Sequence, residues 1–334
     1  MGDERFPFLL SGVSKEYIWG GTKLIREYAR PGSWDTMAEY WECSTHPDGI
    51  SRAASGRFKG EALDVILRSH PEYIGHKAVL ADSRHEGSLP ILVKLIDATQ
   101  DLSIQVHPDD DFAMIHENGQ RGKSEFWYIL ETEPDAGLIY GFYRDITPDT
   151  LRKALQGGTV SNYVQRVPVS RDDIFYVEAG TVHAICAGTV LAEIQESSNL
   201  TYRLYDYDRT DKNGLKRELH IDKAMQVLDY SASPQPRQPM RLIRYIPGMA
   251  EEFLFRCRYF EVARLLVLAD TDPGAGHRSG PGSFEILLCI DGAGRLSAPG
   301  MDDIAFAKGD CIFIPAGSVP MKLFGHGSLL KIHC

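Results

Sequence analysis

No stretch of this sequence approaches 18 consecutive apolar residues, so the sequence predicts no membrane-spanning helix. The first residues, MGDERFPFLL, contain no apolar run long enough for a signal peptide. The six cysteines are scattered and form no CxxC pair, which favours free, mostly buried thiols in a reducing compartment. We therefore expect a cytoplasmic protein.

The chain also lacks an excess of basic residues. Its formal net charge of −10 argues against a nucleic-acid partner, which normally requires a basic surface. A small anionic substrate remains compatible with this charge, because a local cluster of Lys and Arg outweighs the global sign. The 43% of hydrophobic and 25% of charged residues are typical of a globular protein, and 334 residues suffice for one large domain or two to three ordinary ones.

Strand signals dominate what the sequence does contain. The expected strands are short, rich in β-branched or aromatic residues, and bounded by Gly, Pro or Asp. Many such strands in succession predict an antiparallel sandwich or barrel. They lie at 91–98, 102–107, 125–130, 137–143, 174–177, 189–196, 260–268, 284–290, 311–317 and 321–325.

Helical patterns are fewer, and we expect helices at about 57–83, 147–164 and 215–230. In the second of these, Thr147 is a candidate N-cap and Pro148 suits the first helical position. The segment 231–240 is rich in Ser, Pro and Gln, which predicts a linker.

An internal repeat organises the chain. GKSE with the following FWYIL resembles GSFE with the following ILLCI, and DIFYVEAGTVHA resembles DCIFIPAGSVPM further along. The first copy is longer by roughly the length of the helical segment at 147–164, which we interpret as an insertion. The sequence thus predicts an elaborated unit over 1–230 and a plain unit over 241–334.

The first copy holds a candidate metal site. Gln105 and His107 share one face of the strand in LSIQVHPDD, because side chains alternate with a period of two. Glu125 begins the next strand, and His183 follows the turn EAGT. These nitrogen and oxygen ligands suit a divalent transition metal, zinc foremost, with a coordination position left open for water or substrate.

A single histidine at a strand end is more commonly a hydrogen-bonded or surface residue, so the second copy matters. It keeps Glu285 but has Pro320 where His183 would align, and the spacing of His277 does not match the Gln-x-His pair. One copy therefore carries a complete ligand set and the other has lost it, as expected of a duplicated fold with one working metal site.

These motifs carry a family resemblance. QVH with a downstream Glu, and GTVHA after an aromatic strand, resemble the two metal motifs of cupins. LSIQVHPDD, GKSEFWYIL, AGTVHAI and LAEIQESSNLTYRLYDYDR, in this order, resemble type I mannose-6-phosphate isomerases in their shorter bacterial form. The resemblance runs from YIWGG near the N-terminus to the IPAG turn near the C-terminus. It implies a mainly β fold of two cupin-type β-barrel or jelly-roll units with a helical insertion.

The resemblance also implies roles for single residues. The ligands of one zinc ion per chain would be Gln105, His107, Glu125 and His183. The catalytic arginine of the family falls on Arg203, an active-site carboxylate on Glu193, and substrate-pocket lysines on Lys94 and Lys123. One departure is Glu178, where cupin turns usually carry proline.

The implied reaction interconverts mannose 6-phosphate and fructose 6-phosphate through an enediol, with zinc as Lewis acid. Glu193 and a lysine are both candidates for the group that moves the proton. Arg203 is a poor base and fits an electrostatic or phosphate-binding role, while Lys123 and Lys94 suit phosphate or hydroxyl groups.

The residues taken alone allow plainer interpretations. Arg203 lies in a charged aromatic stretch typical of a surface network, strand alternation would turn Glu193 to solvent, and Lys123 follows a Gly-rich turn. Lys94 is more informative, because a lysine within an apolar strand is costly unless it lines a wet cavity or has a partner.

Two other functions remain open at this point. The first is another enzyme of the same fold, such as a different sugar-phosphate isomerase. The second is a non-enzymatic, sugar-phosphate-binding regulatory cupin. A metal-dependent oxygenase fits less well, because it would use two or three histidines with iron. We expect a phosphorylated hexose as partner, no membrane or nucleic acid, and a monomer or homodimer.

Overall fold

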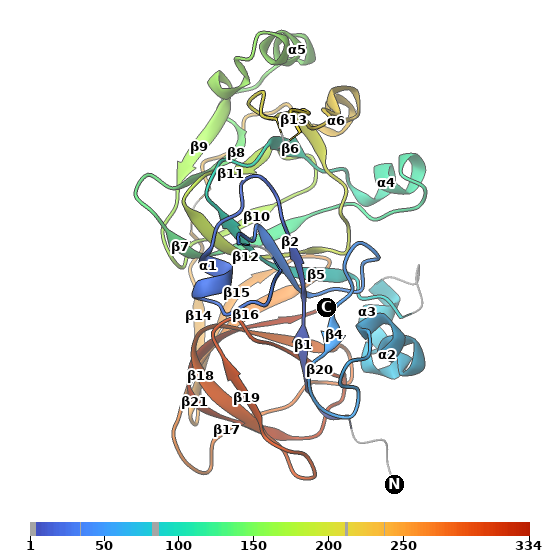
Figure 1. Ribbon diagram of the computed structural model, residues 1–334, viewed down its shortest axis with the longest axis vertical. Helices are drawn as coiled ribbons and strands as arrows, with labels where there is room; N and C mark the ends of the chain where they lie inside the picture. Colours follow the sequence, from blue (N-terminus) through green and yellow to red (C-terminus); the bar gives the residue numbers. More distant parts are fainter. Residues whose placement is uncertain (1–4, 34, 82–86, 211–212, 237) are drawn as a thin grey trace.

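The computed structural model describes residues 5–33, 35–81, 87–210, 213–236 and 238–334. It is mainly β, as the sequence predicts, and its strands form three open sheets arranged in two units along the long axis of the molecule (Figure 1). None of the described helices is long and apolar enough to cross a membrane.

The N-terminal unit consists of two facing antiparallel sheets. The first has the strand order β10 (Ile174–Val177), β7 (Glu125–Thr132), β12 (Thr189–Glu196), β5 (Ile91–Ala98), β3 (Glu39–Cys43) and β2 (Val13–Lys15). The second has the order β13 (Tyr202–Tyr205), β6 (Ile104–Val106), β11 (His183–Ile185), β8 (Gly137–Phe142) and β9 (Val164–Pro168).

The C-terminal unit is built on one ten-stranded sheet. Its main path is β14 (Leu242–Ile246), β15 (Met249–Arg256), β16 (Glu261–Ala269), β21 (Met321–His333), β18 (Glu285–Ser297), β20 (Cys311–Ile314), β1 (Phe8–Ser11) and β4 (Arg52–Ala53). Two strands lie off this path, β17 (Ala275–His277) beside β21 and β19 (Ile304–Ala307) beside β18.

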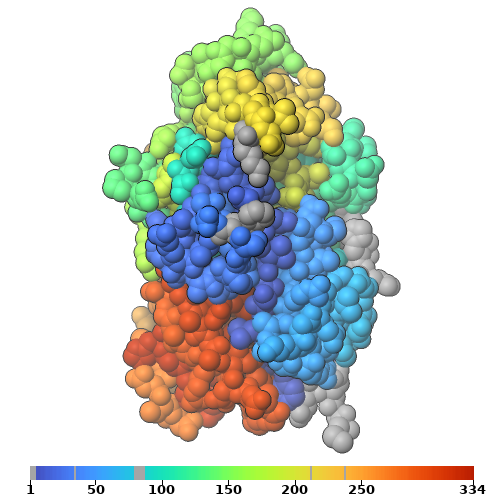
Figure 2. All heavy atoms as spheres, viewed as in Figure 1, coloured from blue at the N-terminus to red at the C-terminus, as the bar shows by residue number. Residues whose placement is uncertain are grey.

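Two N-terminal strands thus belong to the C-terminal sheet, which a contiguous division of the sequence does not anticipate. β1 pairs with β20 through Phe8 opposite Phe313, and β4 pairs with β1. Figure 2 shows the N-terminal residues, in blue, packed across the middle of one face between the two halves. The boundary between units 1–230 and 241–334 stays a prediction, but membership of the sheets does not follow it.

The helices occupy the edges of the sheets. The expected segment at 147–164 contains α5 (Pro148–Gln156), and Thr147 caps it by accepting a hydrogen bond from the Thr150 amide, as predicted. The expected segment at 57–83 contains three short helices rather than one long helix, and its residues 82 and 83 lie outside the described part of the chain. The remaining helices are α1 (Lys23–Arg26), α2 (Leu63–Ser69), η1 (Pro71–Tyr73), α3 (His76–Ala81), α4 (Asp110–His116), η2 (Val160–Asn162) and α6 (Ile221–Val227).

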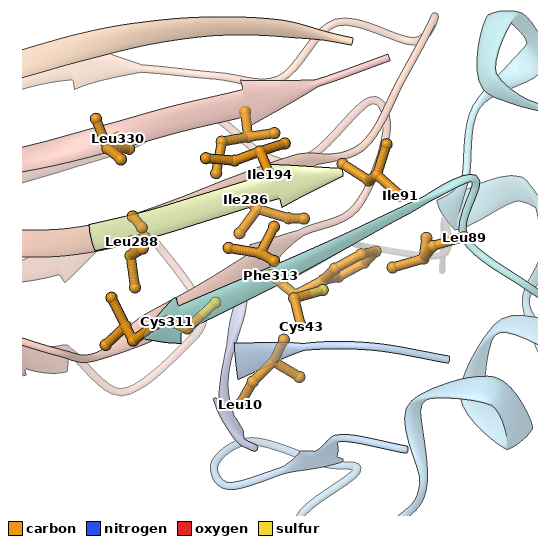
Figure 3. Close-up of a cluster of buried hydrophobic side chains, with 14 of the residues drawn as sticks. Leu10, Cys43, Leu89, Ile91, Ile194, Ile286, Leu288, Cys311, Phe313 and Leu330 are labelled. Atoms are coloured by element: carbon orange, nitrogen blue, oxygen red, sulfur yellow. The ribbon is translucent and has the colours of Figure 1, made fainter. Parts of the chain in front are cut away.

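The central strands β5 and β12 of the six-stranded sheet are buried on both faces. Ile91, Val93 and Leu95 of β5 pack into a core shared with the C-terminal strands, and Figure 3 shows Ile91 and Ile194 beside C-terminal side chains such as Ile286. Residues that alternate with these, such as Ile96, point into the space between the two N-terminal sheets. A polar side chain on that second face therefore points into the N-terminal unit rather than to bulk solvent.

Candidate metal centre and active site

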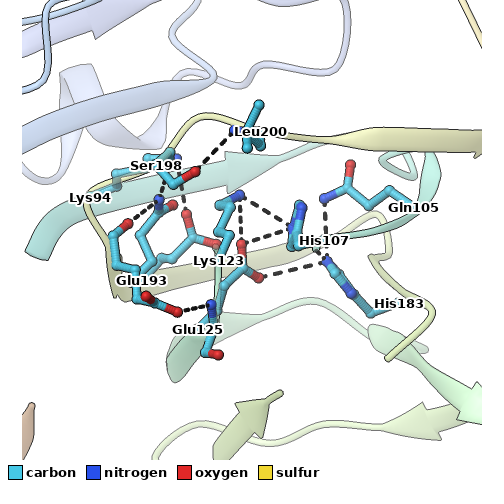
Figure 4. Close-up of polar contacts among 12 residues, drawn as sticks. Lys94, Gln105, His107, Lys123, Glu125, His183, Glu193, Ser198 and Leu200 are labelled. Carbon is cyan, nitrogen blue, oxygen red and sulfur yellow. Dashed lines mark hydrogen bonds and ion pairs between the residues drawn. The ribbon is translucent and has the colours of Figure 1, made fainter. Parts of the chain in front are cut away.

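Three potential metal ligands meet between the two N-terminal sheets. His107 follows β6, Glu125 begins β7 and His183 begins β11, and each is about 1% exposed. β6 and β11 pair with Gln105 opposite His183, which fixes the fourth predicted ligand beside the other three. Figure 4 shows these side chains converging from separate strands.

The distances between these ligand atoms suit one small cation. His107 Nε2 lies 3.1 Å from His183 Nε2 and 3.1 Å from Glu125 Oε1. His183 Nε2 lies 3.6 Å from Glu125 Oε2 and 3.3 Å from the side-chain amide nitrogen of Gln105. Ligands at ordinary zinc bond lengths in a tetrahedron are about 3.4 Å apart, so this cluster has the size of a zinc site.

The protonation of the ligands also fits a metal. His183 Nδ1 lies 2.8 Å from the Thr181 carbonyl oxygen, and donating its proton there leaves Nε2 as the free lone pair. Burial and the Lys123 ammonium lower the pKa of His107 to about 3, so its ring is neutral at pH 7. Burial raises the pKa of Glu125, but Lys123 and His107 more than offset this and hold the carboxyl ionised. A half-turn of the Gln105 amide brings its oxygen toward the same point.

Lys123 supplies the nearest positive charge. Its Nζ lies 2.6 Å from Glu125 Oε1 and 3.3 Å from His107 Nε2, and the side chain is 5% exposed. The plain interpretation of Lys123 as an exposed loop charge is therefore wrong. Its ammonium stands beside the ligand atoms, on the side that faces the cavity described next.

A cavity of about 250 Å³ opens beside these ligands. Polar groups dominate its lining, which includes the predicted residues Lys94, Gln105, Lys123, Glu193 and Arg203. All eight residues singled out from the sequence thus either belong to the ligand cluster or line this cavity.

Lys94 and Glu193 form a buried pair because their strands pair directly. β5 and β12 are antiparallel neighbours with Lys94 opposite Glu193, and Lys94 Nζ lies 3.1 Å from Glu193 Oε2. Trp127 Nε1 donates to Glu193 Oε1 at 2.9 Å, and Glu39 Oε2 lies 3.7 Å from Lys94. The expectation from alternation that Glu193 faces solvent is wrong, because both faces of β12 are covered.

The charges of this pair respond to burial and to each other. Burial and the nearby Glu125 raise the pKa of Glu193, and Lys94 opposes them. Burial lowers the pKa of Lys94, but Glu39 and Glu193 more than offset it and raise the pKa above its usual value. Lys94 therefore stays protonated and charged, while Glu193 takes up a proton at a higher pH than a free glutamate does.

Arg203 brings positive charge to the opposite side of the cavity. It lies opposite Gln105 in the pairing of β13 with β6, and its Nη1 donates to the Glu218 carbonyl at 2.8 Å. Its Nε is buried and has no hydrogen-bond partner among the described residues. Burial and repulsion from the neighbouring Arg217 guanidinium lower the pKa of Arg203.

Arg217 is a cavity residue that the sequence analysis missed. It lines the cavity with Arg203, and Asp206 holds it through a bond from Arg217 Nε to Oδ2 at 2.8 Å. Asp206 also binds Arg209 at 2.6 Å. Arg217 lies in an irregular segment between β13 and α6, outside every motif, so only its charge offered a signal.

Comparison with known proteins gives consistent results along the chain. Residues 8–156 match the model of the phosphomannose isomerase type I catalytic domain, and residues 250–334 match that of the mannose-6-phosphate isomerase cupin domain. Mannose-6-phosphate isomerase ManA of Bacillus subtilis is 36% identical over 328 residues, which cover 98% of each protein.

Solved structures of mannose 6-phosphate isomerases are similar to this chain over nearly its whole length. The crystal structure of the mannose 6-phosphate isomerase from Bacillus subtilis superposes with a TM-score of 0.88 at 31% identity, covering 98% of this chain and 99% of the other. A mannose 6-phosphate isomerase crystallised with zinc and yttrium has the same fold, with a TM-score of 0.72 at 17% identity and coverage of 98% and 99%. The chain therefore belongs to the type I mannose-6-phosphate isomerase family.

Proposed function

We propose that this chain interconverts mannose 6-phosphate and fructose 6-phosphate in the cavity beside the ligand cluster, with one zinc ion held by Gln105, His107, Glu125 and His183. The observation that carries the proposal is the buried His107–Glu125–His183 cluster at a cavity lined by lysine, arginine and glutamate. The names of the relatives and the zinc in a structure of the same fold support it.

The bound zinc would supply a Lewis-acid charge that stabilises negative oxygen as it develops in the reaction. The chain itself contributes buried ligands beside a shaped cavity, where electrostatic interactions are stronger than in bulk water. Lys123, 2.6 Å from Glu125, is placed to donate hydrogen bonds to a sugar oxygen next to the cluster.

The proton transfer between C1 and C2 is assigned to Glu193. Its carboxylate lies on the cavity wall, and Trp127 and Lys94 fix its orientation by one contact to each oxygen. Burial raises its pKa, which brings the carboxyl closer to the range in which a group accepts and returns a proton. Lys94 is already committed to Glu193 and Glu39, so its role is to hold these carboxylates and to bind a sugar hydroxyl.

The phosphate is assigned to the arginine side of the cavity. Arg203 and Arg217 present two guanidinium groups; Asp206 binds Arg217, and the Glu218 carbonyl oxygen accepts a hydrogen bond from Arg203. Paired N–H groups of arginine match phosphate oxygens, and each such charge-assisted bond is stronger than a neutral one. A dianion placed there would also relieve the repulsion between the two arginines.

The test combines metal analysis with a coupled assay on mannose 6-phosphate. We expect about one zinc per chain, by the four-ligand site, and loss of both metal and turnover in Glu125→Ala. Glu285→Ala is the matched control, because Glu285 occupies the corresponding strand position of the second unit; it should keep both. If metal-replete protein binds the sugar phosphate without turnover, the chain is a regulatory binding protein instead. A cytoplasmic location and the choice between monomer and homodimer stay predictions.

A further inference from the structure

The second unit differs from the first at the positions that correspond to the metal ligands. The strand pairs that start the two motifs correspond, because Val177 lies opposite Glu125 and Ile314 lies opposite Glu285. Equal steps along the chain from Val177 and Ile314 reach His183 and Pro320, so Pro320 takes the place of the second histidine.

The pairing of β17 with β21 shows which face of the sheet each residue occupies. His277 lies opposite Met321, which packs in the core of the second unit, so the alternating residues Arg278 and Lys322 point to the outer face. The outer face of this sheet, rather than the position that corresponds to the metal ligands, therefore carries these two cations.

The retained glutamate has a different partner. Glu285 Oε2 lies 2.8 Å from His277 Nε2, a contact that the sequence spacing did not suggest. Among the described residues, the only cluster of three or more His, Cys, Asp or Glu side chains that would hold a metal is the one in the first unit. The pocket that Arg278 lines thus lies on the other face of the sheet from the position that corresponds to the metal ligands.

The pocket around Arg278 has a volume of about 870 Å³ and carries a positive charge. Arg278, Arg295 and Lys322 line it, against a single lining carboxylate, that of Asp272. Lys322 and Asp272 are 3.7 Å apart and both well exposed, so they neutralise each other weakly.

Arg278 is free to bind. Its Nε donates to the Ser318 carbonyl at 3.1 Å, which orients the guanidinium, while no partner for its two terminal nitrogens is found in the described part of the chain. Arg295 is fixed differently, with its guanidinium 3.9 Å above the Phe324 ring and Nη1 2.8 Å from Asp303. The pocket therefore has one uncommitted guanidinium and two weakly compensated cations.

The remaining lining suits a small organic body. Pro299, Pro320, Met321 and Phe324 provide apolar surface, and Ser297 provides a hydroxyl. The chain as a whole has a net charge of −10, so a local group of three cations on a concave surface is a departure from its surroundings.

We infer that this pocket is a second binding site for a phosphorylated small molecule, whose phosphate is held by Arg278 with Lys322 and Arg295. A planar guanidinium pairs with two phosphate oxygens, and the apolar wall accommodates the carbon skeleton. β17 and β18 lie at the end of the molecule away from β6 and β11 (Figure 1), so the inference is independent of the function proposed for the first unit.

The test follows the pocket itself rather than turnover. Hydrogen exchange of the zinc-loaded full chain is measured with inorganic phosphate and with glucose 6-phosphate. We expect slower exchange at residues 276–280 and 320–324, and an apparent Kd for this effect that rises about tenfold or more in Arg278→Gln/Lys322→Gln. Arg152→Gln, an exposed arginine on α5, is the matched charge control and should behave as wild type.

Each outcome decides the matter. Protection by both probes shows recognition of the phosphate group alone, and protection by glucose 6-phosphate alone shows that the sugar contributes; both support the site. No protection with either probe, or equal protection in Arg278→Gln/Lys322→Gln and wild type, overturns it. Arg278 is exposed, and the side chains of Lys322 and Arg152 are 50% and 48% exposed. Substitutions at such surface positions rarely disturb folding, so the variants are expected to fold.

Discussion

The Nε2 atoms of His107 and His183 lie 3.1 Å apart between two sheets that exclude solvent from both rings. With the His183 proton on Nδ1, its Nε2 lone pair points at the other ring, and Glu125 adds a negative charge within 3.1 to 3.6 Å of both. A buried carboxylate and two facing imidazoles are stabilised by a cation at their centre, which Lys123 replaces only in part.

Removal of the metal tests this relationship. Dialysis against a strong chelator should take zinc below about a tenth of an equivalent and turnover down at least about a hundredfold, because the proposed zinc ion would carry the Lewis-acid charge. The thermal midpoint should fall as well, since the ligand charges then remain buried without their counter-ion. Metal analysis, the coupled assay and calorimetry measure the three effects, and added zinc should restore them. Full turnover by metal-free protein would contradict the assignment.

The buried pair of Lys94 and Glu193 predicts a large loss of stability. Lys94→Met leaves the buried carboxylate of Glu193 and the partly buried carboxylate of Glu39 without their cation, which should cost about 3–5 kcal/mol in the free energy of unfolding. Lys94→Met/Glu193→Gln should lose less, because the nearest uncompensated charge is also removed. Urea denaturation of the zinc-loaded protein measures both.

An exposed lysine pair provides the control for this prediction. Lys223 contacts Glu117 and is 49% exposed, so Lys223→Met should cost less than about 1 kcal/mol. If Lys94→Met is no more destabilising than this control, Lys94 is not the counter-ion of the buried carboxylates.

Arg217 predicts a change in substrate binding. Arg217→Ala removes one of two guanidinium groups facing the proposed phosphate position, so KM for mannose 6-phosphate should rise about tenfold or more, with a smaller change in kcat. Arg209→Ala serves as the control, because Arg209 binds the same Asp206 but is not part of the cavity lining. An equal rise in KM in both variants would mean that Arg217 acts only through Asp206.

Local patterns predicted the strands and one cap of this fold well. The expected strands at 91–98, 174–177 and 189–196 coincide with β5, β10 and β12, because β-branched and aromatic runs between turn residues are a local signal. Thr147 and Pro148 likewise carry their capping chemistry within one turn.

Local sequence patterns did not predict the contacts between segments that are distant in the chain. Alternation misplaced Glu193, because it does not reveal that a second sheet and the C-terminal unit cover the two faces of one strand. The contact of His277 with Glu285 depends on the register of β17 against β21, which no spacing rule gives. Arg217 reaches the cavity from a loop, and the position of its side chain depends on the contact with Asp206.

Glu42 leads to a prediction about pH, because it is a fully buried carboxyl on β3. Arg30 Nη1 lies 3.3 Å from Glu42 Oε2, while Arg30 Nη2 binds Asp310 at 2.8 Å and so shares its charge between two acids. Burial is the dominant influence and raises the pKa of Glu42 from 4.5 to about 8, against the opposing effect of Arg30.

Between pH 4.5 and about 8, the Glu42 carboxyl keeps its proton in the folded chain but loses it in the unfolded chain, because its pKa is raised by folding. Its contribution to stability is therefore greatest below pH 4.5 and falls as the pH rises toward 8. Glu42→Gln keeps the shape of the protonated acid and does not ionise. The difference in unfolding free energy, wild type minus Glu42→Gln, should fall by about 2–3 kcal/mol between pH 5.5 and pH 8. Urea denaturation of both zinc-loaded proteins at several pH values measures it, and Glu61→Gln, at an exposed position, is the control. Parallel pH profiles for wild type and Glu42→Gln would show that Arg30 keeps Glu42 ionised throughout.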